Sequence, residues 1–293
     1  MTVREPVLIQ SRENALFKQL KRLAHESGAY RRQGRVWIEG EHLCSAARLR
    51  GWRPEVVVFA ESARPAQATA LPALPPGEDG GEGGLPGARQ KFHHSNQSET
   101  LSGKAQAAIK TVIFTDALWR EFTALESPEG VGYVLTLPAA PEVLPAAPTV
   151  VLDRVQDAGN VGSILRSAAA FGFAQVLALK GTALLWSPKV LRAGMGAHFG
   201  LRLVEGLALD HLQALKVPLL ATSSHQGEWL HRAPLPWPCG WLMGHEGQGV
   251  TPALQARAAQ HIRIVQPGGE ESLNVAAAAA VCLHASAAQQ HRA

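Results

Sequence analysis

The sequence has few cysteines and no long apolar run. Its three cysteines, Cys44, Cys239 and Cys282, lie far apart, which argues against a disulfide framework or a zinc ribbon and indicates a reducing cytoplasm. The longest apolar stretch, Val275 to Leu283, is mostly alanine and falls short of the roughly 18 residues that cross a membrane. Residues 1–6 lack the apolar core of a signal peptide. We therefore expect a cytoplasmic protein without a membrane partner.

Charged residues are also sparse, at 18% of the chain, while 46% of the 293 residues are hydrophobic. This length and composition are typical of a globular protein of two domains. The net charge of +4 says little by itself, but residues 1–35 carry eight basic and three acidic side chains, an excess of five. Such an excess attracts a phosphate backbone, and it equally fits a solvated helix face.

Composition divides the chain into two α/β regions. Residues 1–137 form the first domain, with an expected flexible insertion at 71–88 that holds four prolines and six glycines. Residues 138–148 contain four prolines and predict an extended linker. Residues 149–293 form the second domain, whose strands are continuous apolar runs, as in a parallel sheet covered on both faces.

Hydrophobic periodicity predicts the elements of each region. In the first, the strands are 36–38, 56–59, 112–114 and 131–135, and the helices are a segment capped by Ser11, 40–50 and 116–125. In the second, the strands are 150–152, 176–179, 219–222, 241–243 and 262–265, and the helices are 161–171 and 272–289.

Three polar segments follow strands of the second region. In residues 152–168, Asn160 is expected to cap a helix that carries Arg166, and ligands bind at such strand ends in open α/β sheets. In residues 241–250, three glycines surround Glu246 and could wrap a flat ligand. In residues 262–275, a Pro-Gly-Gly turn leads to Ser-Leu-Asn at a helix start. Each segment alone also fits an ordinary capped helix or a tight turn.

Together, in this order and spacing, the three segments resemble the motifs of the SpoU/TrmH family of RNA methyltransferases. The quoted patterns are Asn-Val-Gly-x-x-x-Arg from Asn160, Gly-x-Glu-Gly-x-Gly from Gly244 and Ser-Leu-Asn-Val from Ser272. Residues 187–197 resemble the segment that the family has between its first two motifs. The likeness covers residues 150 to about 288, and weaker cues in the first half resemble the family's accessory domain.

The resemblance implies a fold, a reaction and a set of site residues. The implied fold is an α/β SPOUT domain with a parallel sheet and a deep trefoil knot, preceded by a ribosomal-protein-like α/β domain that binds the RNA substrate. The implied reaction is methylation of a ribose 2′-hydroxyl by S-adenosylmethionine in a homodimer, with rRNA as the first choice of substrate and tRNA as the second. The implied catalytic residues are Asn160, Arg166, Glu246, Ser272 and Asn274, and the implied cofactor contacts are Gly244, Ile264 and Leu273.

Two positions depart from the family pattern. Ala158 replaces the usual proline, which predicts a looser turn before Gly159, and Gln266 replaces an apolar residue in the expected wall of the cofactor pocket. Neither change removes a polar group assigned to chemistry. Because arginine stays protonated below about pH 12, we expect Arg166 to hold a phosphate and stabilise a developing alkoxide, although a role as the base remains the alternative.

The sequence suggests three other interpretations. A catalytically inactive RNA-binding protein of the same fold is the main alternative, but all five polar positions are present. A nucleotide-dependent Rossmann enzyme is suggested by Gly194-Met195-Gly196, which lacks the required third glycine. Twelve histidines are present, yet none has the spacing of metal ligands, so no metal site is expected.

Overall fold

A computed structural model describes residues 5–65, 109–139, 141–223, 226–268 and 272–290. The expected insertion at 71–88 lies outside these residues. The chain divides into two compact units, one of Met1–Gln19 and Trp37–Thr136, the other of Leu20–Val36 and Leu137–Ala293. The division at Thr136 lies one residue from the expected end of the first domain, but Leu20–Val36 joins the second unit. There the Tyr30 hydroxyl donates to the Glu205 carboxylate at 2.6 and 2.8 Å.

The first unit is built on a five-stranded mixed sheet in the order β1-β4-β3-β5-β2. Its strands are β1 (Val7–Ile9), β2 (Arg35–Glu39), β3 (Pro54–Ala60), β4 (Lys110–Phe114) and β5 (Val131–Thr136). The helices in this part of the sequence are α1 (Ala15–His25), α2 (Ala29–Gln33), α3 (Glu41–Leu49), the 3-10 turn η1 (Glu61–Ala63) and α5 (Asp116–Phe122). Buried aromatic rings fill the core, with Trp37 and Phe114 each packed edge-on against Phe122. The expected α/β alternation is therefore present here.

The second unit contains a seven-stranded sheet in the order β10-β12-β9-β11-β6-β7-β8, with parallel pairing throughout. Its strands are β6 (Thr149–Asp153), β7 (Gln175–Leu179), β8 (Arg202–Leu207), β9 (Leu219–Thr222), β10 (Glu228–Trp229), β11 (Gly240–Gly244) and β12 (Gln260–Arg263). Its helices are α6 (Ala158–Ala170), α7 (Pro188–Gly194), η2 (Ala197–Gly200), η3 (Leu209–Ala214), α8 (Pro252–Gln255) and α9 (Val275–Gln290). The prediction of a parallel α/β sheet is confirmed.

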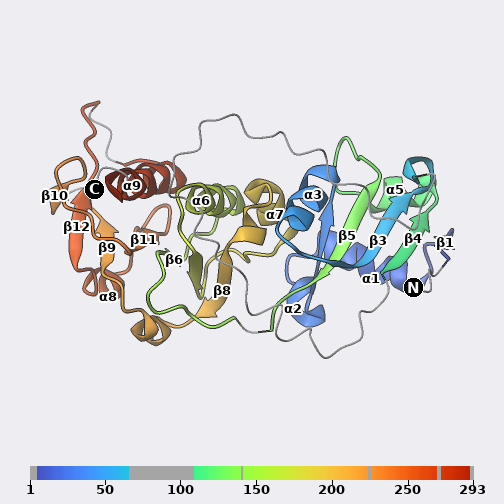
Figure 1. Cartoon of the computed structure of the whole chain (residues 1–293), viewed down its shortest axis with the longest axis horizontal. Coiled ribbons are helices and arrows are strands. Elements are labelled where there is room, and N and C mark those ends of the chain that lie inside the picture. Colours follow the sequence, from blue (N-terminus) through green and yellow to red (C-terminus); the bar gives the residue numbers. More distant parts are fainter. Residues whose placement is uncertain (1–4, 66–108, 140, 224–225, 269–271, 291–293) are drawn as a thin grey trace. The chain divides into compact units, whose positions relative to one another are not determined.

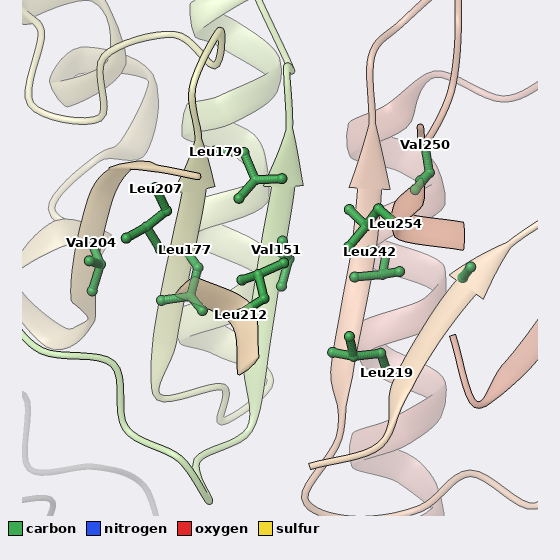
Figure 2. Packing of buried hydrophobic residues seen from close by; sticks show 11 residues of the cluster. Val151, Leu177, Leu179, Val204, Leu207, Leu212, Leu219, Leu242, Val250 and Leu254 are labelled. Carbon is green, nitrogen blue, oxygen red and sulfur yellow. The ribbon is translucent and has the colours of Figure 1, made fainter. Parts of the chain in front are cut away.

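Helices cover both faces of this sheet. Within the unit, α6, α7 and α9 lie along one face, and α8 lies on the opposite face (Figure 1). An apolar cluster joins that opposite face to Leu212 of η3 and Leu254 of α8, and Val151, Leu177 and Leu242 of three strands are fully buried within it (Figure 2). Because both faces are covered, the strands read as continuous apolar runs.

Several boundaries differ from the sequence prediction because a different side chain caps the helix. Asn14 caps α1 in place of Ser11, because its Oδ1 accepts from Leu16 N at 2.9 Å, whereas Ser11 Oγ accepts from Glu13 N, before the helix begins. The helix expected at 161–171 begins at Ala158, and its N-cap is Asp157, so the assignment of Asn160 as the cap is wrong. The helix expected from Ser272 begins at Val275 with Asn274 as its cap.

The topology brings the three polar segments to one edge of the sheet. Strands β6 and β11 are paired in register, with Asp153 opposite Gly244. After β6 the chain continues to β7 on one side of this pair, and after β11 it continues to β12 on the other. Such a change of direction is where open α/β sheets bind ligands. No helix among the described residues is long and apolar enough to cross a membrane.

Candidate active site at the ends of β6 and β11

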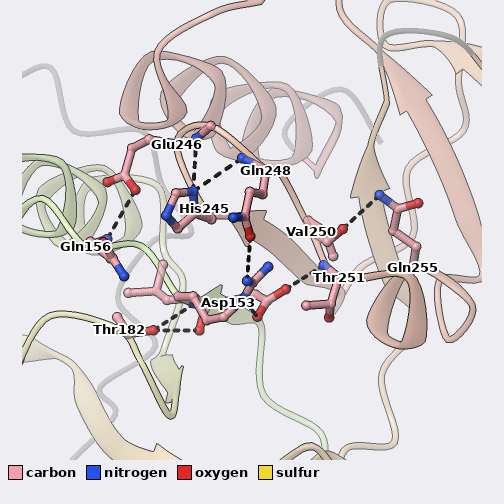
Figure 3. A network of polar contacts seen from close by, with 12 residues as sticks. Asp153, Gln156, Thr182, His245, Glu246, Gln248, Val250, Thr251 and Gln255 are labelled. Atoms are coloured by element: carbon pink, nitrogen blue, oxygen red, sulfur yellow. Dashed lines mark hydrogen bonds and ion pairs between the residues drawn. The ribbon is translucent and has the colours of Figure 1, made fainter.

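The site is formed where the loop after β6, residues 154–157, meets the glycine loop after β11, residues 245–249. The glycine loop closes on itself through two backbone hydrogen bonds between His245 and Gly249, of 2.8 and 3.0 Å. The His245 ring Nδ1 accepts from the backbone of Gly247 at 3.0 Å and of Gln248 at 3.2 Å. The loop therefore has an internal framework, and its side chains reach outward to its neighbour (Figure 3).

Glu246 joins one end of the glycine loop to the loop after β6. Its Oε1 accepts from Asp157 N at 3.0 Å and from Asn160 Nδ2 at 3.2 Å, and its Oε2 accepts from Gln156 N at 3.2 Å. Partial burial alone raises the pKa of Glu246, but hydrogen bonds from the backbone of Asp157 and of Glu246 itself, the Asn160 amide and the backbone of Gln156 outweigh it and lower the pKa to about 2. Glu246 is therefore a carboxylate at neutral pH and acts as an acceptor.

The two asparagines continue this network to the third polar segment. Asn274 Oδ1 accepts from the backbone of Ala276 at 2.9 Å and of Ala277 at 3.2 Å, which caps α9. Its Nδ2 donates to Asn160 Oδ1 at 3.0 Å, and Asn160 Nδ2 donates onward to Glu246. Both amides are thus oriented by their partners, and residues more than 110 positions apart in the sequence form one chain of hydrogen bonds.

A second set of contacts holds the other end of the glycine loop. Asp153, at 2% exposure, accepts from Arg154 Nε at 3.2 Å and from Thr251 N at 2.6 Å. Arg154 also donates from a terminal guanidinium nitrogen to Gln248 Oε1 at 2.8 Å. The Arg154 backbone has a left-handed φ of 60°, and its N–H donates to Thr182 Oγ1 at 3.1 Å. These residues tie the loops after β6, β7 and β11 together.

The glycine loop also passes very close to the end of β11. A Cβ added to Gly244 would lie 2.1 Å from the carbonyl carbon of Gly249 and 2.2 Å from the nitrogen of Val250. No side chain fits there, so only glycine allows the loop to fold back on the end of β11 this closely. Leu273 is 41% exposed, and Ile264 is half-buried at the end of β12, which adds apolar surface beside the third segment.

Two predicted catalytic residues lie outside the network. Arg166 is exposed on α6, six residues beyond Asn160, so the two side chains project about 120° apart around the helix. Among the described residues Arg166 has no hydrogen-bond or ion-pair partner, and Ser272 likewise has none; Glu246 accepts from Asn160 and not from Arg166. The structure therefore brings together Asn160, Glu246 and Asn274.

Sequence reasoning missed the residues that hold the two loops to each other. Asp153, Arg154, Asp157 and Gln248 all lie within the quoted segments, but their partners are about 90 positions away along the chain, and no spacing signal reveals such a pairing. Among the described residues, no group of three or more histidine, cysteine, aspartate or glutamate side chains is arranged to hold a metal ion.

Comparison with known proteins identifies similar sequences. The sequence model of the SpoU rRNA methylase family matches residues 147–284. RlmB of Bordetella pertussis, a 23S rRNA (guanosine-2′-O-)-methyltransferase, is 33% identical over 201 residues, which are 67% of this chain and 78% of the relative. RlmP of Bacillus subtilis, a 23S rRNA (guanosine(2553)-2′-O)-methyltransferase, is 29% identical over 182 residues, which are 61% of this chain and 73% of the relative.

Similarity to a solved structure extends over both units. A protein of the TrmH family from Porphyromonas gingivalis has 25% sequence identity and a TM-score of 0.70, with 94% of this chain and 98% of that chain covered. The similarity therefore covers nearly the whole length of both chains.

Proposed function

The chain belongs to the SpoU rRNA methylase family, and we propose that it methylates a ribose 2′-hydroxyl in structured rRNA with S-adenosylmethionine as the methyl donor. The match to the family model and to RlmB confirms the family resemblance drawn from the three motifs. The activity is that of an RNA methyltransferase. The observation that carries the proposed site is the hydrogen-bonded chain from Asn274 through Asn160 to Glu246. It unites all three motifs at one edge of the sheet.

The residues present fit the cofactor. Gly244 lets the glycine loop fold closely over the end of β11, and Ile264 and Leu273 offer apolar surface for a flat adenine ring. When bound, S-adenosylmethionine supplies a methyl group on a positively charged sulfur, which is already activated for transfer. The chain's own residues must therefore align the ribose hydroxyl and manage one proton.

The network suits alignment better than proton abstraction. Glu246, with a pKa of about 2, is too weak a base to remove a hydroxyl proton at neutral pH, because an effective base has a pKa near the working pH. Its role is to fix the loop after β6 and the Asn160 amide. Asn160 and Asn274 in turn position the nucleotide and the segment before α9.

Arg166 is proposed to grip a phosphate beside the target ribose. Its guanidinium is exposed and lacks a partner among the described residues, and its planar fork matches phosphate oxygens. A methylation pH–rate profile of wild type and Arg166→Lys tests this role. We expect the lysine variant to lose rate at every pH, since it keeps the charge but not the fork. A near-normal rate with an acid-shifted profile would instead assign proton abstraction to residue 166.

We also propose a deep trefoil knot, a homodimer, an RNA-binding first domain and a cytoplasmic location. A deep trefoil knot is supported by the path of the last segment, which leaves edge-proximal β12 and returns to the ends of β6 and β11 at Asn274. A homodimer through the catalytic domain is supported by the exposed apolar side chains of Met195, Val265 and Val281. The first domain is proposed to bind the RNA. A location in a reducing cytoplasm is supported by the three cysteines, which are free and buried.

The RNA target is tested by mapping 2′-O-methyl nucleosides by mass spectrometry in rRNA and tRNA, with the gene deleted and then restored. We expect one ribose in rRNA, the substrate named for the RlmP and RlmB relatives, to lose its methyl group on deletion. Restoration with wild type returns the methyl group, and restoration with Asn160→Ala does not. If no nucleoside changes and the purified protein binds no S-adenosylhomocysteine, the alternative of an inactive RNA-binding protein replaces this proposal.

A further inference from the structure

Arg154 has a backbone conformation that is energetically unfavourable for every residue type except glycine. Its φ of 60° is left-handed, a region that glycine enters freely and that other residues enter at a cost. Strain of this kind persists only where surrounding contacts hold it, and it concentrates at functional sites. The contacts of Arg154 therefore show what the strained residue holds in place.

The side chain of Arg154 bridges two groups that approach from different parts of the chain. Its Nε donates to Asp153 Oδ1 at 3.2 Å, and a terminal nitrogen donates to Gln248 Oε1 at 2.8 Å. Asp153 is itself buried and receives Thr251 N at 2.6 Å on its other oxygen. The guanidinium thus contacts a fixed carboxylate and reaches Gln248 in the glycine loop; Figure 3 shows Asp153, Gln248 and Thr251 in this network.

The glycine loop has two outward attachments among the contacts described. Glu246 attaches it to the loop that begins α6, and Gln248 attaches it to Arg154. Without the second attachment, the loop would keep its internal hydrogen bonds through His245, but only Glu246 would hold it against the loop after β6.

We infer that Arg154 is a positioning residue, which holds the glycine loop through Gln248 against the loop after β6, so that the loop keeps its place over the end of β11 in the cofactor pocket. This inference rests on the proposed function. It assigns Arg154 no contact with the reacting atoms. Lysine cannot replace the arginine, because a single ammonium on a flexible stem cannot span Asp153 and Gln248 in one plane.

Binding of S-adenosylhomocysteine, measured by titration calorimetry, tests the inference without requiring the RNA substrate. Arg154→Gly removes the side chain and also relieves the left-handed strain, so a purely structural residue would give an equally or more stable protein with unchanged binding. We expect Arg154→Gly to weaken binding about tenfold while the thermal unfolding midpoint stays at or above that of wild type. Arg154→Lys should bind as poorly as Arg154→Gly.

A double-mutant cycle then asks whether Arg154 acts through Gln248. Gln248→Ala alone should also weaken binding about tenfold, and the double variant should be no worse than either single variant, because both remove the same contact. Arg257→Ala is the matched control. Arg257 has the same 31% side-chain exposure as Arg154, and it also contacts a carboxylate, that of Asp210. It belongs to neither loop, so the Arg257→Ala variant should bind S-adenosylhomocysteine as wild type does.

Provided that wild type binds S-adenosylhomocysteine, three results would overturn the inference. They are normal binding by Arg154→Gly, losses that multiply in the double variant, and an equal loss of binding in Arg257→Ala. Absence of binding by wild type would instead refute the proposed function, and the two failures are therefore distinguishable. In a methylation assay with deproteinised rRNA from cells lacking the gene, Arg154→Gly should raise the KM for S-adenosylmethionine by a larger factor than it lowers kcat.

Discussion

Replacing Glu246 by glutamine tests the network at its centre with the smallest change in shape. The carboxylate accepts three hydrogen bonds, two on Oε1 from Asp157 N and Asn160 Nδ2 and one on Oε2 from Gln156 N. In Glu246→Gln the oxygen can keep the first two donors. The new Nε2 then faces the Gln156 N–H, which is also a donor, so the third hydrogen bond is lost.

The size of the effect follows from that single loss. A hydrogen bond to a charged group contributes about 1.5–3 kcal/mol, and the lower end applies because Glu246 is exposed and water can replace part of the contact. A loss of about 1.5 kcal/mol corresponds to about a tenfold change in a rate constant. We therefore expect kcat/KM for methyl transfer to rRNA to fall about tenfold in Glu246→Gln and further in Glu246→Ala.

The same variant predicts a pH dependence of stability. The pKa of Glu246 is lowered in the folded protein from 4.5 to about 2, so the folded state favours the carboxylate. Its stabilising contribution is full above about pH 4.5 and is lost as the pH falls toward 2. The difference in free energy of unfolding between wild type and Glu246→Gln, measured with urea, should be constant from pH 6 to 7 and shrink between pH 4.5 and 2.

Glu142→Gln is the control for both measurements, because Glu142 is exposed in the same unit and its side chain has no hydrogen bond among the described residues. It should match wild type in rate and in stability at each pH. The reasoning is refuted if Glu246→Gln methylates at the wild-type rate, or if its stability difference from wild type grows as the pH falls below 4.5.

Three further substitutions test the packing around the site. Gly244→Ala should weaken S-adenosylhomocysteine binding more than about tenfold in calorimetry, because its Cβ meets loop backbone at 2.1 Å, whereas Gly247→Ala, with 3.9 Å to its nearest neighbour, should bind normally. Gly162→Ala should lower the free energy of unfolding by about 2 kcal/mol in urea, since its Cβ would lie 2.3 Å from that of Ala193. Burial lowers the pKa of His198 from 6.5 to about 4, so wild type should lose up to about 3 kcal/mol of stability between pH 6.5 and 4, and His198→Gln should show a flatter profile in the same urea experiment.

The sequence predicted the second unit more fully than the site. Strands such as β6 and β11 are continuous apolar runs bounded by polar residues, and that pattern depends only on burial by local neighbours. Strand β8 was missed because Arg202, Glu205 and Gly206 interrupt its apolar run. Edge strand β10 has two residues, too few for any periodicity.

The partners of the site residues could not be predicted from spacing. Asn160 was expected to cap α6 because asparagine is a common cap, but Asp157 lies three residues earlier and takes that role. That choice frees the Asn160 amide for Glu246 and Asn274. The competition between two nearby capping side chains is decided by contacts 86 and 114 positions away, which a local pattern does not contain.

The charges of the described site bear on how the ribose proton leaves. Glu246 is held ionised by its donors, the two asparagines are neutral amides, and the arginine guanidinium only donates hydrogen bonds. None of these groups accepts a proton readily at neutral pH. In the proposed reaction, Arg166 would hold a phosphate beside the target, the negative charge developing on the ribose oxygen would be stabilised electrostatically, and the proton would pass to solvent. The hydrogen-bond network would then assist the reaction by holding the reacting groups in position. Glu246 suits this role because it stays ionised at neutral pH and keeps its three donors in place.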